Sequence, residues 1–165
     1  NVENDSYNGD LLVTMANHQR KKISDLRKGD QIWNSKINNA ISVNHIMDYE
    51  IKVAMIEIRL GVKKLVVTPN HPFRTDRGMV MANQLKPGDR IGEFPHVEGV
   101  VSAIKAQSMR KQTVFDIFLD PEIPMHQRFV VIEGFSLPDF SLQNLWQEQD
   151  ELSQIYLLSS DERGE

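Results

Sequence analysis

A short segment that occurs twice constrains the fold of this chain more than any other feature. The stretch "SDLRKGDQI" (24–32) recurs as "NQLKPGDRI" (83–91), an offset of 59 residues from Gly29 to Gly88. Two copies are too few for a solenoid, which needs three or more units. Each copy is predicted to run strand, turn, strand, short helical turn, Gly-Asp corner and strand. The pair therefore predicts a β domain with a pseudo-twofold axis.

The other apolar segments are mostly short and end at turn residues, which is typical of strands. From Ile56 to Leu60, apolar residues alternate with Glu57 and Arg59, the period of a half-buried strand. Hairpin-turn chemistry is found at 16–21 and 75–78. The predicted strands are 11–15, 53–60, 65–67, 113–119 and 128–135. Together they predict an all-β domain.

The C-terminal part of the chain has a different pattern. Between 141 and 156 the apolar residues follow helical spacing, with acidic and amide residues between them and no proline or glycine. The apolar positions are Leu142, Leu145, Trp146, Leu152, Ile155 and Tyr156. We expect an amphipathic helix here that packs on the β domain, on a second copy or on a partner, followed by a polar tail.

Composition excludes several classes of function. The chain has 165 residues and a net charge of -4, which argues against a nucleic-acid partner because a basic patch would be needed. No apolar run approaches the ~20 residues of a membrane helix, and the polar, acidic first ten residues give no sign of a signal peptide. The absence of cysteine excludes disulfides and thiolate metal sites. His18, His45 and His96 have no metal-ligand spacing, so no metal or cofactor is expected.

The stretch "LVVTPNHPFRT" (65–75) places Thr68 and His71 directly after an apolar run. Pro69 and Pro72 restrict φ on either side, so the hydroxyl and the imidazole leave a rigid corner. Taken alone, Thr-x-x-His more often marks a structural histidine at a strand end than a catalytic one. Other segments are needed to decide between these readings.

Four segments in order resemble the Hint superfamily, which contains inteins, hedgehog autoprocessing domains and bacterial intein-like domains. They are "GDLLVTMANHQRKKISDLRKGDQIW", "LVVTPNHPFRT", "LKPGDRI" and "VFDIFLD…MHQRFVVIEG", which span roughly residues 6–137. The first is most similar to hedgehog-like members, including those attached to von Willebrand A-type domains. The resemblance implies an all-β horseshoe with a pseudo-twofold, and a chain divided into upstream residues 1–5, a Hint domain at 6–140, and a helix and tail at 141–165.

The resemblance also implies chemistry. Hint domains cleave their own backbone at their first residue, and Ser6 stands at that place, ahead of Gly9-Asp10. Ser6 would attack the carbonyl of Asp5 and move the acyl group from nitrogen to oxygen. Thr68 matches the residue that orients the scissile peptide, and His71 matches the proton donor to the departing nitrogen. Water, a thiol or an alcohol would then release the upstream segment.

Two further residues match family positions. Asp116 in "VFDIFLD" matches an aspartate that many members use in the acyl shift or the following transfer, although an edge-strand carboxylate would look the same. His126 in "MHQRF" matches the later family histidine, after an inserted "PEIP" that lengthens the gap from Asp116.

The chain departs from splicing members near its C-terminal end. Pro138 and Asp139 stand where splicing inteins have His-Asn, and an aspartate has no amide nitrogen with which to cyclise. Cleavage without splicing is therefore expected. Serine is a weaker nucleophile than a thiol, and a native serine and one that replaces a cysteine fit the sequence equally. The alternative is a degenerate, inactive Hint fold that serves as a binding or structural module.

Overall fold

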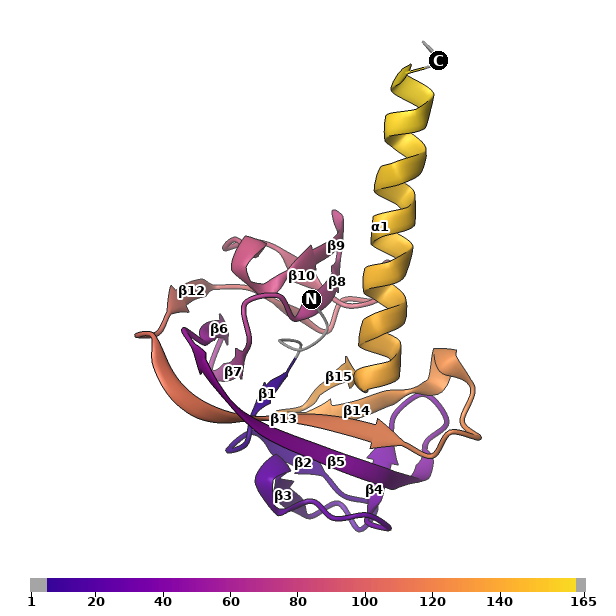
Figure 1. The fold of residues 1–165 in the computed structure, drawn as a ribbon. Coiled ribbons are helices and arrows are strands. Elements are labelled where there is room, and N and C mark those ends of the chain that lie inside the picture. The colour runs from indigo at the N-terminus through magenta and orange to yellow at the C-terminus, as the bar shows by residue number, and fades with distance from the viewer. Residues whose placement is uncertain (1–5, 163–165) are drawn as a thin grey trace.

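Antiparallel strands make up most of the fold, and one long helix follows the last strand (Figure 1). The computed structural model describes residues 6–162 and, of their side chains, those of residues 6–151. The largest sheet within this range has the order β12 (Ala103–Ala106), β6 (Ile56–Leu60), β7 (Lys63–Val67), β1 (Tyr7–Asn8), β13 (Arg110–Leu119), β5 (Asn39–Val53) and β4 (Gln31–Asn34). The all-β prediction with a C-terminal helix is confirmed.

Two four-stranded sheets complete the described β structure. One has the order β11 (Gly99–Val100), β10 (Arg90–Ile91), β8 (Pro72–Thr75) and β9 (Gly78–Met81). The other has the order β15 (Phe135–Pro138), β14 (Phe129–Ile132), β2 (Leu12–Thr14) and β3 (Arg20–Lys22). Short 3₁₀ helices are η2 (Ile23–Asp25), η3 (Ala82–Gln84) and η4 (Met125–Gln127).

The sequence repeat is a structural repeat. η2 and η3 occupy the same place in the two copies, and each is followed by a glycine with positive φ, +91° at Gly29 and +95° at Gly88. The amide of Gly29 donates to the carbonyl of Val43, and that of Gly88 to the carbonyl of Val101, both at 2.8 Å. The two equivalent glycines thus make matching hydrogen bonds, which agrees with the predicted pseudo-twofold.

Two sequence predictions about strands were wrong. Residues 128–135 are not one strand, because β14 ends at Ile132 and pairs with β15 through a turn at Glu133 and Gly134. Both turn residues have positive φ, 51° and 83°, as a two-residue type I′ hairpin requires. Residues 53–60 are not one strand either, because Val53 ends β5 and β6 begins at Ile56.

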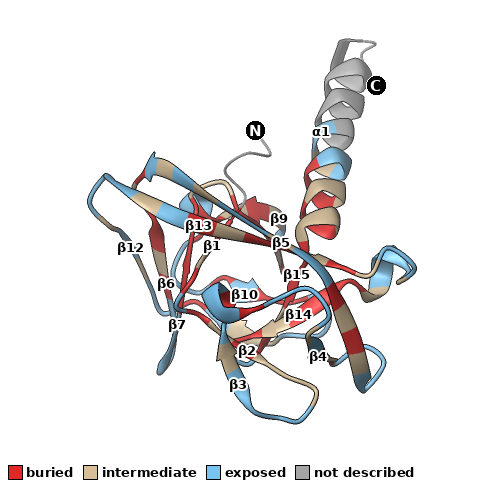
Figure 2. Cartoon of the chain, turned by 60° about the horizontal axis from the view of Figure 1, so that its bottom comes forward, coloured by how far each residue is buried: buried red, intermediate tan, exposed pale blue. Residues whose placement is uncertain are grey.

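The core lies where the strands of the two copies meet. One continuous apolar cluster contains Ile23 and Ile32 of the first copy together with Ala82 and Ile91 of the second. Figure 2 shows buried residues along β1, β6 and β2 and exposed residues mainly on the outer loops. The two halves therefore share one interior, and β1 passes through it with Tyr7 fully buried.

The C-terminal helix α1 (Phe140–Glu162) is longer than predicted. Asp139 caps its start, because the Asp139 Oδ1 accepts the amide of Leu142 at 2.9 Å. Leu142 and Trp146 are buried against Phe129, so the first turns pack on the chain's own β structure, and the rest of α1 leads away from the sheets (Figure 1). Leu152, Ile155 and Tyr156 lie outside the described side chains. Of the helices described, none combines the length and the apolar character that crossing a membrane would demand.

Candidate active site

Strand pairing determines the neighbours of Ser6. Tyr7 on β1 pairs with Phe115 on β13 and with Val67 on β7, and both pairings are antiparallel. The residue before Tyr7 must then lie between the residue after Phe115 and the residue after Val67. Those residues are Asp116 and Thr68. The sheet thus places a carboxylate on one side of Ser6 and a threonine on the other.

Every polar atom of Ser6 has a hydrogen-bond partner. The Ser6 amide donates to Thr68 Oγ1 at 2.8 Å, and the Ser6 carbonyl accepts the Thr68 amide at 3.0 Å. The Ser6 hydroxyl donates to Asp116 Oδ1 at 3.0 Å and lies 2.6 Å from the hydroxyl of Tyr49. Ser6, Thr68 and Asp116 are all buried. Three of the residues predicted for the site therefore form one hydrogen-bonded cluster.

Tyr49, on β5, is the site residue that the sequence analysis missed. A serine hydroxyl has one proton, and here Asp116 accepts it. The contact between Ser6 and Tyr49 must then use the proton of the tyrosine, so Tyr49 is the donor to Ser6 Oγ. No local pattern in "MDYEIK" indicates this role, because it depends on the register between β5 and β13.

His71 lies next to the cluster, in the core. Its ring centroid is 4.5 Å from that of Tyr7 and 5.0 Å from that of Phe73. Its Nδ1 is 3.1 Å from the carbonyl of Pro72, and since a carbonyl can only accept, Nδ1 carries the proton. Its Nε2 is buried with no hydrogen-bond partner within the described part of the chain. Burial lowers the pKa of His71 to about 3, so the ring is neutral near pH 7.

The turn that holds Thr68 and His71 is fixed from two sides. The amide of His71 donates to the carbonyl of Thr68 at 3.1 Å, which closes the turn. The amide of Asn83, in η3, donates to the carbonyl of Pro69 at 2.9 Å. A second contact comes from α1, where Gln147 Nε2 donates to the carbonyl of Asn70 at 3.1 Å. The C-terminal helix therefore contacts the turn of Thr68 and His71 directly.

Comparison with models of known protein families shows which family the chain belongs to. The model of the Vint family, described as a Hint domain, matches residues 6–137, from Ser6 to the last residue but one of β15. The chain belongs to the Vint family of Hint domains. The predicted membership of the Hint superfamily is confirmed, while the closer likeness to hedgehog-like members stays a prediction.

Solved structures agree on the fold of this Hint domain. The gp41-1 intein matches with a TM-score of 0.63 at 16% identity, over 81% of this chain and 98% of that one. A DnaB intein from Synechocystis sp. PCC 6803 matches with a TM-score of 0.64 at 19% identity, over 81% of this chain and 97% of that one. The bacterial intein-like domain of Clostridium thermocellum matches with a TM-score of 0.65 at 18% identity, over 82% of this chain and 98% of that one. At these identities the likeness shows an intein-like fold and nothing finer.

One similar sequence is part of a much longer protein. The probable translation initiation factor IF-2 of Pyrococcus furiosus is 31% identical over 105 residues. That alignment covers 62% of this chain but 10% of the factor. The likeness therefore concerns a small part of the factor.

His126 is not part of the buried cluster. It lies exposed in η4. Ser6, Thr68, His71 and Asp116, in contrast, are all buried. Asp5, whose carbonyl Ser6 would attack, lies outside the described residues.

The position of the splicing asparagine has a structural role in this Hint domain. Asp139 is fully buried, accepts the amides of Leu119 and Leu142 at 3.2 and 2.9 Å, and pairs with Arg128 at 3.2 Å. Burial raises the pKa of the Asp139 carboxyl, while the backbone donors and Arg128 act in the opposite direction. Asp139 thus caps α1 and fixes the end of β13. Among the described residues, no group of three or more His, Cys, Asp and Glu side chains is arranged to hold a metal ion.

Proposed function

We propose that this Hint domain cleaves its own chain at the bond between Asp5 and Ser6. Ser6 Oγ attacks the carbonyl carbon of Asp5 and its proton passes to Asp116, the acceptor 3.0 Å away. The C–N bond then breaks, and the acyl group is transferred from nitrogen to oxygen. The observation that carries the proposal is the buried hydroxyl of Ser6 bound to a carboxylate while Thr68 holds the amide of the same residue at 2.8 Å.

The departing nitrogen of Ser6 needs a proton, and we assign its delivery to His71. In the described conformation the ring is neutral and its Nδ1–H is directed to the Pro72 carbonyl. His71 must therefore gain a proton at Nε2, or release Pro72, before it donates. Both changes cost free energy in a buried site, so the acyl shift is slow.

The ester formed at Ser6 is then cleaved by water, a thiol or an alcohol, which releases residues 1–5 and whatever precedes them. Splicing does not follow, because Asp139 offers no amide nitrogen for cyclisation and its carboxylate is committed to the helix cap. In this scheme residues 6–140 are the processing domain, and 141–165 are an added helix and tail.

The test uses a fusion with a longer N-terminal segment and the substitution Ser6→Cys. A thiol is the better nucleophile and a thioester the better electrophile, so hydroxylamine or dithiothreitol releases the segment faster than from the Ser6 protein. Adding His71→Ala slows release by about 10²–10⁴-fold, the range for loss of a general acid. Mass spectrometry over time follows both products, and Ser6→Ala is the control that forms no ester.

A second candidate is an inactive Hint fold that acts as a binding or structural module. One observation favours it: His71 is directed to the carbonyl of its own neighbour, Pro72, and not to Ser6. A Ser6→Cys protein that stays intact under both reagents, with an unchanged melting temperature, supports this module over the self-cleaving domain.

A further inference from the structure

The inference concerns the second half of the proposed reaction and rests on that proposed function. Ser6 Oγ is the nucleophile in the acyl shift, but it is the leaving atom when the ester is cleaved. A thiolate leaves readily because a thiol has a pKa near ~8.5. A serine alkoxide is far more basic and leaves well only if a proton reaches it as the bond breaks. A Hint domain that uses serine therefore needs an acid at Oγ.

Tyr49 is the group placed to supply that proton. Its hydroxyl lies 2.6 Å from Ser6 Oγ, and the hydrogen-bond directions make it the donor. Asp116 is the other group at this oxygen. In the proposed scheme it releases to solvent the proton that it took from Ser6 in the acyl shift, so when the ester is cleaved it is a carboxylate, which accepts and cannot donate. Tyrosine is a suitable acid because a phenol is protonated at neutral pH and is more acidic than an aliphatic alcohol.

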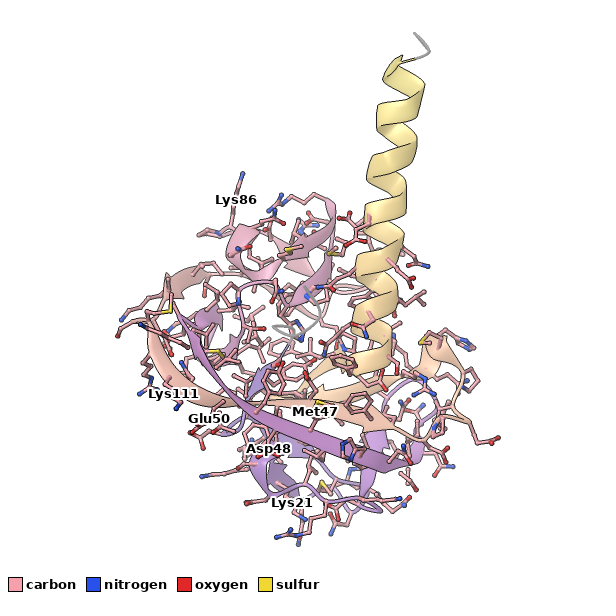
Figure 3. The ribbon with its side chains drawn as sticks, in the orientation of Figure 1. Lys21, Met47, Asp48, Glu50, Lys86 and Lys111 are labelled. Carbon is pink, nitrogen blue, oxygen red and sulfur yellow. The ribbon has the colours of Figure 1, made fainter. Side chains whose placement is uncertain are left out.

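The position of the Tyr49 hydroxyl is fixed by the sheet. Tyr49 pairs with Val114, two residues before Asp116 on the same face of β13. Its ring packs on the cluster formed by Val53, Met55, Val66 and Val114. The neighbours Asp48 and Glu50 are exposed instead, and Figure 3 shows both on the β5–β13 ribbon with Glu50 beside Lys111, 3.3 Å away. Tyr49 is thus a half-buried residue on the face of the ribbon that carries Asp116, which places its hydroxyl at Ser6.

We propose that Tyr49 is the general acid that protonates Ser6 Oγ when the ester is cleaved. The incoming nucleophile bonds to the carbonyl carbon, the C–Oγ bond breaks, and the phenol proton moves to Oγ. Ser6 returns as a hydroxyl. The nucleophile gives its own proton to solvent, and solvent returns a proton to the phenolate. No oxidant, metal or further reactant is needed for the balance.

The experiment compares four proteins in the same N-terminal fusion: Ser6 or Ser6→Cys, each with Tyr49 or Tyr49→Phe. Release of the N-terminal segment by hydroxylamine is timed by mass spectrometry. On the Ser6 background Tyr49→Phe slows release by about 10²-fold or more, the lower end for a general acid. On the Ser6→Cys background it changes the rate by less than about threefold, because a thiolate needs no acid. Asp48→Asn, at an exposed β5 position on the opposite face of the strand, is the control and changes neither rate.

Two outcomes overturn this inference while the proposed function stands. The first is equal slowing on both backgrounds, which makes Tyr49 a structural support for the nucleophile. The second is unchanged release from Ser6 with Tyr49→Phe, because the phenol then gives serine no help as a leaving group. No release from Ser6 while Ser6→Cys is cleaved removes both the ester at Ser6 and the role of Tyr49. If neither Ser6 nor Ser6→Cys releases the segment, the proposed function itself fails, and the role of Tyr49 fails with it.

Discussion

At the scale of single residues, the atoms of the site differ in whether they have hydrogen-bond partners. Thr68 holds both backbone groups of Ser6, and Asp116 and Tyr49 hold its hydroxyl. His71 differs, because its Nε2 has no hydrogen-bond partner among the described residues and its ring lies in an apolar environment. A buried imidazole of this kind has measurable consequences for stability.

The stability of the domain depends on pH through His71. The pKa of its imidazole falls from 6.5 to about 3 on folding because burial disfavours the charged ring. Between these values the unfolded chain binds a proton that the folded chain does not, so the free energy of unfolding is highest above pH 6.5 and falls as pH decreases. The slope approaches about 1.4 kcal/mol per pH unit from this residue alone.

Urea denaturation between pH 6.5 and 5, above the range where most carboxylates titrate, measures this slope. His71→Gln lacks the titrating imidazole, so its free energy of unfolding depends less steeply on pH. His126→Gln, at an exposed position, keeps the wild-type slope. Equal slopes for the wild type and His71→Gln contradict a neutral buried histidine.

The sequence predicts some residues of this site but not others, because some are placed only by the pairing of distant strands. Ser6, Thr68, His71 and Asp116 were found because they stand in family segments, and the structure joins three of them by hydrogen bonds. Tyr49 was missed because its role comes from pairing between strands more than sixty residues apart in the chain, β5 and β13. His126 was chosen by the same matching and lies exposed in η4. Sequence motifs identify residues within one local segment, whereas the register between paired strands decides which distant side chains lie beside them.

At the scale of elements, α1 and β5 show where local patterns are informative. The 3.6-residue period predicted α1, and its first turns bury Leu142 and Trp146 as expected. The fifteen-residue β5 was not predicted, because exposed polar residues such as Asn44, Asp48 and Glu50 interrupt its apolar positions. A long two-stranded ribbon of this kind is held by its partner, here β13.

Trp146 is the residue that attaches α1 to the domain. Its ring lies 6.0 Å from that of Phe129, and the guanidinium of Arg74 lies 5.1 Å from its centroid. Trp146→Ala is expected to lower the free energy of unfolding by about 3–5 kcal/mol, the range for a buried aromatic truncation. Glu148→Ala, at an exposed position of the same helix, is the control and changes stability by less than about 0.5 kcal/mol. A Trp146→Ala protein with wild-type melting would mean that α1 is a passive tail.

At the scale of the whole molecule, two similar halves share one core and place the reactive segment between them. β1 pairs with β7 on one side and with β13 on the other, so residue 6 is surrounded by groups that come from distant parts of the chain. The repeat of residues 24–32 at 83–91 predicted the pseudo-twofold, and the equivalent Gly29 and Gly88 hydrogen bonds agree with it. Neither copy alone contains Ser6, Thr68 and Asp116, so the proposed self-cleavage requires the complete domain.

The most direct test of self-cleavage is the mass of the fragments released by hydroxylamine from an N-terminal fusion of the Ser6 protein. The account predicts an upstream fragment that ends at Asp5 as a hydroxamate and a second fragment that begins at Ser6. Hydroxylamine also attacks Asn-Gly bonds, and a break at Asn8–Gly9 differs in mass and persists in the Ser6→Ala control. Fragments that arise only from Asn8–Gly9, or that are the same with Ser6 and Ser6→Ala, contradict an ester at Ser6.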